Sequence, residues 1–219
     1  MSELVARTGR QQQRYEGGYR LIAGCIPFKF RNSEDGDNSP EKVVEVLMIN
    51  STSGPGLLFP KGGWENDETS EEAAEREAME EAGVRGDLVH YLGCYPFKSK
   101  TLQDACSPQG LCRAAMYALH VKEELEFWPE KSHRERRWLS IPEATGCCRH
   151  VWMREALEEG FSKWYANVGG ADWPPFDQLL LQTESRSSAV ARGVGIAGER
   201  SASYCVHQSH FNLFIYYYF

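Results

Sequence analysis

Apolar and aromatic residues gather in short runs separated by polar stretches, and the length of these runs predicts β-strands. The predicted strands cover residues 19–30, 43–49, 57–59, 88–97, 114–121 and 137–141. Pro60 and the glycine pair Gly62–Gly63 follow the third run, so we expect that strand to end there and a turn to begin. The polar stretch 101–113 is predicted to form a hairpin insertion between two later strands.

Two further segments have the residue spacing of helices. The first runs to about Ala82 and is followed by Gly83, a residue type that commonly closes a helix because it readily adopts left-handed backbone angles. Its N-cap is expected at Asp67, Thr69 or Ser70. The second covers residues 142–166, with a bend or break at 146–150. This irregular alternation of strands and helices favours an α/β sandwich with a mixed sheet over a doubly wound parallel one.

The length of 219 residues, of which 42% are hydrophobic, suits one folded domain and leaves little room for a second. We expect an N-terminal segment at 1–17, the folded domain at 18–168 and a largely disordered C-terminal tail at 169–219. No apolar run is long enough to cross a bilayer, which predicts a soluble protein. Seven cysteines without paired spacing indicate free thiols in a reducing compartment.

The N-terminus allows two interpretations of where the protein resides. It lacks the hydrophobic core of a secretory signal, which favours the cytoplasm, with the nucleus as a further location. The first twenty residues carry Arg7, Arg10, Arg14 and Arg20 against two acidic side chains. A mitochondrial presequence is therefore the alternative.

Acidic charge is concentrated in one stretch of the chain. The formal net charge is −7, yet residues 65–81 contain nine acidic side chains and a single basic one, Arg76, which leaves the remaining chain at +1. Local acidity within a near-neutral surface indicates a cation site rather than a polyacidic protein. Nucleic-acid binding through bulk positive charge is not expected.

The same stretch contains a fixed pattern of glycine, glutamate and arginine. Gly62 is followed after five residues by Glu68 and, after seven more, by the string Arg-Glu-Ala-Met-Glu-Glu-Ala-Gly-Val at 76–84. Seven specified residues coincide by chance with a probability on the order of 10⁻⁸ per starting position. A solvated acidic helix is the simpler interpretation of a charge run, but it requires neither the glycine nor the lone arginine. We expect Glu68 and Arg76 to join loop and helix through charge-assisted hydrogen bonds.

Three of these acids are placed for metal binding. On a helix, Glu77, Glu80 and Glu81 are i, i+3 and i+4 neighbours, so their carboxylates lie on one side. They repel one another unless a hard cation such as Mg²⁺, which prefers oxygen ligands, lies among them. The backbone of Gly62–Gly63 leaves room beside such a cation for an incoming phosphate.

The pattern resembles the signature of the Nudix hydrolases, and none of its fixed positions is missing. The resemblance implies an α/β/α sandwich, hydrolysis of phosphoanhydride bonds, and Mg²⁺ or Mn²⁺ as cofactor. The implied metal ligands are Glu77, Glu80, Glu81 and Gly62, and the implied catalytic residues are Glu80 and Arg76. Glu80 is our first choice as the base that accepts a proton from the attacking water. Members of the family differ in which glutamate is the base, so the roles among the three stay open.

Beyond the signature, the chain resembles the diadenosine and diphosphoinositol polyphosphate phosphohydrolases, particularly their plant members, from about Arg7 to Tyr165. The strings that carry this resemblance are Thr8-Gly9-Arg10 with Arg14-Tyr15, Ala23-Gly24-Cys25-Ile26-Pro27, Phe59 to Glu65, Val121-Lys122-Glu123-Glu124 and Arg134 to Trp138. The chain departs from the animal members at Ile22, where they carry an arginine, and at residues 53–56, which lack their basic side chain.

Basic side chains outside the signature are expected to grip the phosphates of the substrate. The predicted substrate-binding residues are Arg20, Lys61, Gly63, Lys98, Lys100, Arg134 and Arg136. The resemblance implies Arg20, Arg134 and Arg136, and the others are further candidates. Arginine binds phosphate through paired hydrogen bonds, and lysine supplies a compact charge. The alternative for residues 131–137 is a solvated loop in which neighbouring glutamates neutralise part of the charge.

Three functions of different classes fit these residues. The preferred one is hydrolysis of diphosphoinositol polyphosphates and long diadenosine polyphosphates, such as diadenosine hexaphosphate. The second is hydrolysis of another nucleoside diphosphate derivative, such as ADP-ribose, NADH, coenzyme A or a capped RNA end, with Trp64 and Trp128 as candidates for stacking on a base. The third is a non-catalytic phosphate sensor, against which the intact glutamates argue. The expected partner is a small polyphosphate, with no nucleic acid and no membrane, and the expected state is a monomer or weak dimer.

Overall fold

A computed structural model describes residues 6–7, 12–32, 42–99 and 103–168 of the chain. All of them lie within the unit Met1–Pro174. The predicted tail 169–219 and the predicted phosphate ligand Lys100 lie outside the described residues. The proposed limits of the folded domain, 18–168, stay a prediction.

A mixed β-sheet forms the centre of the fold. Its strands are β1 (Tyr15–Glu16), β2 (Tyr19–Asn32), β3 (Lys42–Asn50), β4 (Leu57–Leu58), β5 (Lys61–Gly63), β6 (Val84–Lys98), β7 (Leu111–Glu124) and β8 (Arg136–Ser140). The main path runs β4-β3-β2-β7-β6, while β1 and β5 pair with β2 and β8 pairs with β3. The pairing of β2 with β7 is parallel and the other strand pairs are antiparallel. The predicted mixed sheet is confirmed.

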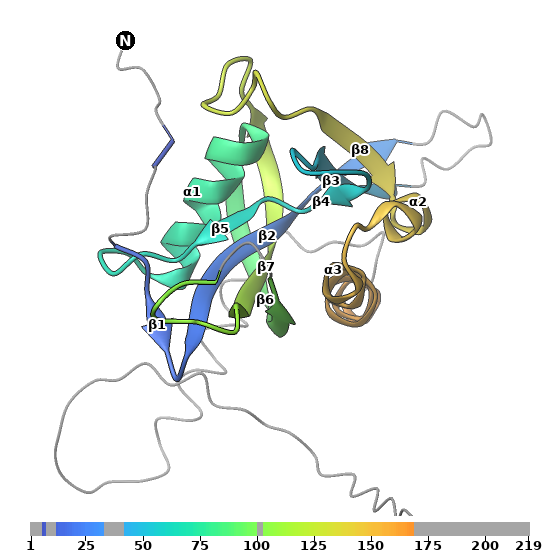
Figure 1. The fold of residues 1–219 in the computed structure, drawn as a ribbon. Helices are drawn as coiled ribbons and strands as arrows, with labels where there is room; N and C mark the ends of the chain where they lie inside the picture. The colour runs from blue at the N-terminus through green and yellow to red at the C-terminus, as the bar shows by residue number, and fades with distance from the viewer. Residues whose placement is uncertain (1–5, 8–11, 33–41, 100–102, 169–219) are drawn as a thin grey trace, which may run out of the picture. The chain divides into compact units, whose positions relative to one another are not determined.

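Helices cover both faces of this sheet. They are α1 (Ser70–Ala82), α2 (Ile141–Cys147), α3 (Val151–Glu155), the π-helical stretch η1 (Ala156–Ser162) and α4 (Lys163–Asn167). Helix α1 lies against one face, and α2 and α3 lie on the other (Figure 1). In β2, Phe28 packs its ring against Phe161 of η1 at a centroid distance of 5.3 Å. The predicted sandwich is confirmed, as is the break between α2 and α3.

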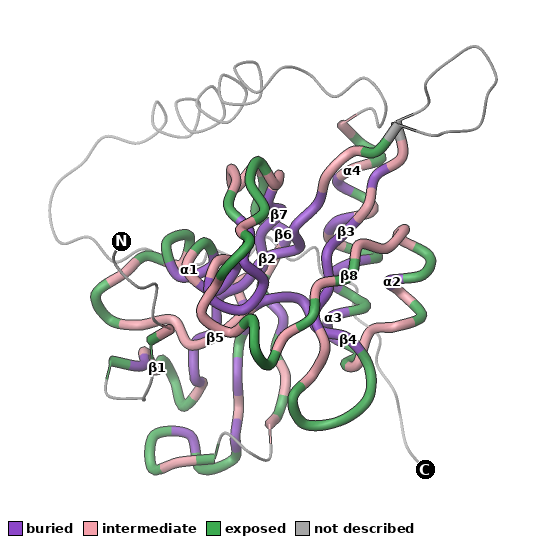
Figure 2. The backbone as a smooth tube through the Cα atoms, turned by 90° about the horizontal axis from the view of Figure 1, so that it is seen from above, coloured by how far each residue is buried: buried purple, intermediate pink, exposed green. Residues whose placement is uncertain are grey.

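The buried core follows the central strands and the inner side of α1. Figure 2 shows buried positions concentrated in β2, β3 and β7, with exposed positions in the connecting loops. On α1, four alanines are completely buried: Ala73, Ala74, Ala78 and Ala82. Side chains of this size let the helix backbone approach the sheet closely, so the acidic residues on the same helix are held by a rigid element.

Helix α1 begins and ends where the sequence predicts. Thr69 is the N-cap, and its hydroxyl accepts a hydrogen bond from the Glu72 amide while the Glu72 carboxylate accepts one from the Thr69 amide. This reciprocal pair is a capping box, worth about 1 kcal/mol. Gly83 closes the helix at φ 61° and ψ 37°, and a Cβ atom there would lie 2.6 Å from the Trp128 ring. Both the backbone angles and the contact with Trp128 therefore require glycine.

The predicted turn at Gly62–Gly63 is wrong, because these residues form the short strand β5. Gly62 pairs with Ala23 and Gly63 with Ile22 of β2. Pairing is possible at this close approach because β2 carries a glycine at the crossing: a Cβ on Gly24 would lie 2.5 Å from the Lys61 Cβ. The glycine pair is thereby attached to the sheet rather than to a free loop.

None of the helices in the described part of the chain has the length and apolar character needed to cross a membrane. The six cysteines of this part are free thiols, as their spacing predicts, and the seventh, Cys205, lies outside the described residues.

Replacing Ala78 with leucine tests the close packing of α1 on the sheet. Ala78 has no exposed surface, so a larger side chain must push the helix away, and we expect the free energy of unfolding to fall by about 1–3 kcal/mol. Urea denaturation measures this change. Glu71→Leu, at an exposed position of the same helix, is the control and should change stability by less than about 0.5 kcal/mol. Equal effects of the two substitutions would contradict the packing.

Candidate active site

Three carboxylates are buried on one side of α1. Glu77, Glu80 and Glu81 expose only 8%, 4% and 6% of their surface, although glutamate is among the residue types least often buried. Burial of an ionised carboxylate is costly unless a charge partner compensates it. The contacts of each carboxylate therefore show how the site is built.

Arg76 is the centre of this compensation. Its Nε and Nη2 atoms donate to the two oxygens of Glu68 at 2.9 and 2.8 Å, and Nη2 also donates to the Gly63 carbonyl at 2.9 Å. Nη1 donates to Glu77 at 2.7 Å and to Glu80 at 3.4 Å. One guanidinium thus joins the loop, strand β5 and the helix, and the expected bond between Glu68 and Arg76 is present.

Three residues distant in sequence contact Glu80 and Glu81. Arg134 donates from Nη2 to Glu81 Oε1 at 2.5 Å, and the backbone amide of Lys61 donates to Glu81 Oε2 at 2.8 Å. The backbone amide of Arg7 donates to Glu80 Oε1 at 3.2 Å. Glu80 and Glu81 are therefore held by partners from outside the helix, whereas Glu77 is held by Arg76 of its own turn.

Burial and hydrogen bonding shift the pKa values of Glu77, Glu80 and Glu68 in different directions. Burial, reinforced by the nearby charge of Glu81, raises the pKa of Glu77 to about 8 although Arg76 opposes the rise. Burial also raises the pKa of Glu80. Burial acts in the same direction on Glu68, but hydrogen bonds from Arg76 and the Glu65 amide outweigh it and lower the pKa. The helix thus carries acids that bind a positive charge readily, beside a loop acid that is already paired.

Gly62 lies directly against this acidic group. A Cβ atom on Gly62 would lie 2.1 Å from Glu77 Oε1, far closer than any contact that real Cβ atoms make. Only glycine at position 62 therefore leaves the Glu77 carboxylate where it is. This close contact explains the first fixed glycine of the sequence pattern.

A cleft of about 630 Å³ opens beside β5. Its lining residues include five cationic side chains, from Arg20, Lys61, Lys98, Arg134 and Arg149, together with the backbone of Gly62 and Gly63. No aspartate or glutamate is among the residues that line it. Of the predicted substrate-binding residues within the described chain, all but Arg136 thus meet in one cationic cleft next to the acidic helix.

Arg20 is buried at the bottom of this arrangement. It exposes 7% of its surface, and its Nε donates to Gln13 Oε1 at 2.9 Å. The Gln13 amide nitrogen in turn donates to the carbonyls of Leu21 and Trp64, at 2.7 and 3.1 Å. Gln13 is a supporting residue that the sequence did not reveal, because a lone glutamine in a polar segment carries no signal.

Arg136 lies elsewhere. Its guanidinium donates to the carbonyls of Gly83 and Leu125 at 3.1 and 3.0 Å and stacks on the Trp128 ring at 4.2 Å. A cation at the C-terminal end of a helix interacts favourably with the helix dipole. These contacts assign Arg136 to the closure of α1, so we leave it out of the proposed phosphate-binding set.

Arg149 is a cleft residue that the sequence did not single out. It follows the break between α2 and α3, and its Nη1 and Nη2 atoms donate to the carbonyls of Pro55 and Ser53 at 3.0 and 3.1 Å. The loop at 53–56, which lacks a basic residue of its own, thus receives one from another part of the chain. A parallel bridge between Leu57 and Cys148 brings the two segments together.

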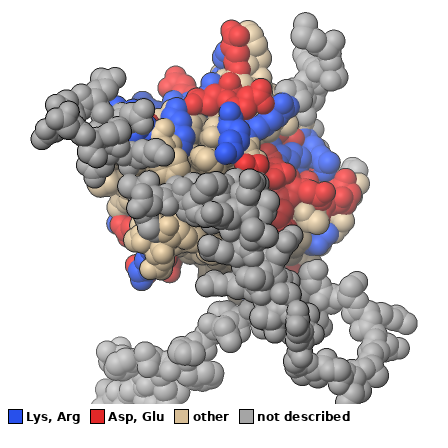
Figure 3. All heavy atoms as spheres, turned by 180° about the vertical axis from the view of Figure 1, so that it is seen from behind, with Lys and Arg blue, Asp and Glu red and all other residues tan. Residues whose placement is uncertain are grey.

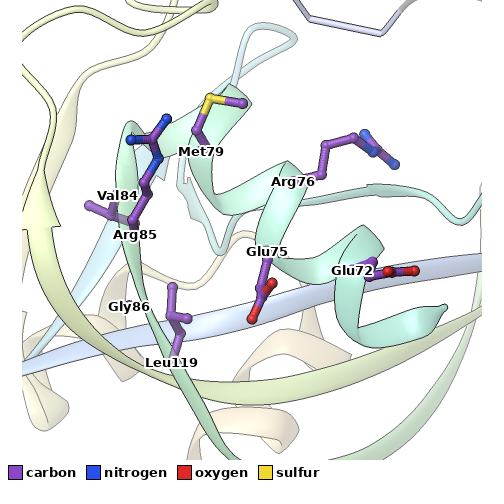
Figure 4. Close-up of a pocket in the computed structure, with 8 residues that line it drawn as sticks. All are labelled: Glu72, Glu75, Arg76, Met79, Val84, Arg85, Gly86 and Leu119. Atoms are coloured by element: carbon purple, nitrogen blue, oxygen red, sulfur yellow. The ribbon is translucent and has the colours of Figure 1, made fainter. Parts of the chain in front are cut away.

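A second, smaller hollow of about 380 Å³ lies on the outer side of α1. Figure 4 shows it between Glu72, Glu75 and Met79 of the helix and Arg85 and Leu119 of the neighbouring strands. Arg76 borders it, but the other predicted site residues do not. We therefore place the substrate in the larger cleft.

An acidic helix beside a cationic cleft, on an α/β/α sandwich, is the arrangement of an enzyme that acts on phosphorylated small molecules. The NUDIX domain family matches residues 36–168, which is more than half of the chain. The chain belongs to the Nudix family and is a Nudix hydrolase of the plant type.

Two relatives and one solved structure illustrate this membership. "Nudix hydrolase 16, mitochondrial" of Arabidopsis thaliana is 67% identical over 166 residues, covering 75% of this chain and 92% of that protein. "Diphosphoinositol polyphosphate phosphohydrolase 2" of Pongo abelii is 32% identical over 187 residues, covering 81% and 91%. A Nudix hydrolase structure from Nitrosomonas europaea has a TM-score of 0.50 at 15% identity, covering 68% of this chain and 90% of that one, and shares the fold.

Nudix hydrolases generally use a divalent metal such as Mg²⁺, and the donors of this site suit one. Three buried carboxylates supply the hard oxygen ligands that Mg²⁺ or Mn²⁺ prefers. In this structure Glu77 and Glu80 share Arg76, Glu80 also accepts from the Arg7 amide, and Glu81 accepts from Arg134. A metal must therefore compete with the arginines for its ligands.

Glu77 makes the stability of the chelator-treated protein dependent on pH. The pKa of the Glu77 carboxyl is higher in the folded protein than its unfolded value of about 4.5, so the folded protein binds this proton more tightly. The proton therefore stabilises the fold at low pH, and this stabilisation is lost as the pH rises from about 4.5 to about 8. We expect the free energy of unfolding to fall by about 2 kcal/mol between pH 5.5 and 7.5. Urea denaturation measures the slope, and Glu77→Gln should remove most of it. An identical slope in the variant would contradict the raised pKa.

Gly62→Ala tests the contact between β5 and the acidic helix. The added methyl group meets the end of a flexible side chain, so the fold should survive while the Glu77 carboxylate moves. We expect Mn²⁺ affinity to fall about tenfold or more with little change in melting temperature. Gly146→Ala, where a methyl group meets nothing within 4 Å, is the matched control. Unchanged Mn²⁺ binding by Gly62→Ala would show that Glu77 is not a ligand.

Proposed function

We propose that this protein hydrolyses phosphoanhydride bonds in diphosphoinositol polyphosphates, long diadenosine polyphosphates such as diadenosine hexaphosphate, or both, with Mg²⁺ or Mn²⁺ as cofactor. The observation that carries the proposal is the cleft with five cationic and no acidic side chains. A nucleoside diphosphate carries too little charge to need five cations. A substrate with several adjacent phosphates does need them.

The proposed reaction uses the acidic helix and the cleft together. Glu77, Glu80, Glu81 and the backbone of Gly62 would hold the metal, which when bound would neutralise charge on the phosphates and orient a water molecule. Glu80 accepts the proton of that water, and Arg76 keeps Glu80 and Glu77 in place. The cationic side chains of the cleft align the phosphate chain for in-line attack.

Aromatic residues support keeping diadenosine polyphosphates beside the inositol compounds. Phe97 and Trp152 line the cleft and stack on each other, with a centroid distance of 4.9 Å and an interplanar angle of 11°. They supply an apolar wall of the kind on which a nucleobase packs. Trp64 and Trp128, which we first considered for that role, already carry Arg14 and Arg136 on their rings, at 4.4 and 4.2 Å.

The surface charge supports a small-molecule partner. Figure 3 shows acidic and basic side chains side by side on the face turned away from the viewer in Figure 1. On this face the mixed charge forms no continuous basic field of the kind that binds a nucleic-acid backbone. A monomer or weak dimer remains our expectation.

We place the protein in the mitochondrion, the alternative location raised by the arginine-rich N-terminus. The name of the 67% identical Arabidopsis relative supports this location, and nothing found supports the cytoplasm. Three of these four arginines, however, contact other described residues, and Arg10 lies outside the described residues. Arg7 contacts Glu65, Arg14 donates to the Asn66 carbonyl and Arg20 is buried, so a cleavage that removed them would damage the fold.

Turnover of four substrates with Mg²⁺ tests the proposed function. Diphosphoinositol pentakisphosphate and diadenosine hexaphosphate should be hydrolysed with a kcat/KM at least about tenfold above ADP-ribose and NADH. Glu80→Gln, which keeps shape but cannot accept a proton, should lower kcat at least about 100-fold. Comparable rates on ADP-ribose or NADH would defeat the substrate choice, and a fully active Glu80→Gln variant would defeat the role of Glu80.

A further inference from the structure

The N-terminal segment contributes directly to the acidic site. Asn66 donates its amide to the Gln12 carbonyl at 2.8 Å, and Arg14 donates its amide to the Trp64 carbonyl at 2.9 Å. The Arg14 side chain stacks on Trp64 and donates to the carbonyls of residues 66 and 68. Residues 12–14 thus form a hydrogen-bonded edge along the loop that leads into α1.

Arg7 extends this edge to the carboxylates. Its Nη1 atom lies 2.7 Å from Glu65, 3.1 Å from Asp67 and 3.7 Å from Glu68. These three acids belong to one loop of four residues, and Arg7 is the cation that joins them. The guanidinium therefore fixes the position of its own backbone relative to that loop.

The backbone of Arg7 then reaches Glu80. Its amide nitrogen donates to Glu80 Oε1 at 3.2 Å, while Arg76 approaches Oε2 of the same carboxylate at 3.4 Å. Two donors on different oxygens restrict the rotation of a carboxylate more than one donor does. Glu80 is thus oriented from one side by its own helix and from the other by the N-terminal segment.

We propose that Arg7 is a positioning residue for the reaction, anchoring the loop 65–68 with its side chain and orienting the Glu80 carboxylate with its backbone amide. This role rests on the proposed function of Glu80. Arg7 is not among the residues that line the cleft, so it acts through Glu80 and not on the substrate. Arg7 is accordingly part of the support of the acidic site.

This role predicts a specific kinetic signature for Arg7→Ala. The variant keeps the amide but loses the ion pairs that hold it, so we expect kcat to fall about tenfold to 100-fold. KM for the fastest substrate of the panel should stay within about twofold, because the cleft is unchanged. Arg7→Lys keeps a cation near the loop and should recover part of the lost kcat.

A matched control separates this effect from general loss of a surface ion pair. Arg31 forms an ion pair with Glu45 at 3.2 Å and its side chain is 61% exposed, so Arg31→Ala should keep the kcat of the unchanged protein. Hydrogen exchange of the amides in 65–68 should be severalfold faster in Arg7→Ala than in Arg31→Ala. This second readout needs no turnover.

Each outcome of these experiments either supports or overturns the positioning role of Arg7. A lower kcat with unchanged KM, partial recovery by lysine and faster exchange in the loop support the positioning role. An unchanged or higher kcat overturns it, and so does a loss confined to KM, which would make Arg7 a substrate contact. If the unchanged protein hydrolyses no panel substrate, the proposed function fails. The exchange data then decide about Arg7: faster exchange supports its anchoring role, and unchanged exchange overturns it.

Discussion

The site depends on positively charged and hydrogen-bonding partners for three carboxylates that α1 buries. These are Glu77, Glu80 and Glu81. Arg76 makes most of these contacts. It binds Glu68 with two donors and also donates to Glu77, Glu80 and the Gly63 carbonyl. A lysine, with one compact ammonium group, cannot span these positions at once. Loss of this guanidinium would leave buried charge unpaired, which is among the most costly defects a folded protein can carry.

The other contacts to the buried carboxylates come from residues outside α1. Arg134 and the Lys61 amide contact Glu81, and the Arg7 amide contacts Glu80. Arg134 also lines the cleft, so one side chain touches both the acidic helix and the space for the substrate. A metal held by Glu81 would take the oxygen that Arg134 contacts, which would leave the Arg134 guanidinium free to bind the phosphates of a substrate.

The sequence predicted the parts of this arrangement that depend on local chemistry. The closing Gly83 and the spacing of the three glutamates are read from neighbouring residues, which also limit the N-cap to Asp67, Thr69 or Ser70; the structure selects Thr69. The short strand at 61–63 was missed, because it exists only through pairing with β2. Local glycine content predicts a turn there, and the tertiary contact overrides it.

Tertiary contacts also decide which of the predicted cationic residues reach the cleft. Arg20, Lys61, Lys98 and Arg134 were chosen by residue type and resemblance, and the fold gathers them in one cleft. Arg136 was chosen on the same grounds, but its contacts lie at the end of α1.

Three residues that contact the site were not identified by any pattern in the sequence. They are Gln13, Arg149 and Arg7. Each is positioned by contacts between segments that are far apart in the chain. Spacing along the sequence does not encode such approaches, so only the fold reveals them.

Direct measurement of divalent-metal binding tests the central claim that the buried acids form a metal site. Mn²⁺ titration followed by electron paramagnetic resonance should show saturable binding to the unchanged protein. Binding to a Glu77→Gln/Glu81→Gln double variant should be at least about tenfold weaker. Equal Mn²⁺ affinity of the two proteins, or no binding to the unchanged one, would contradict the claim.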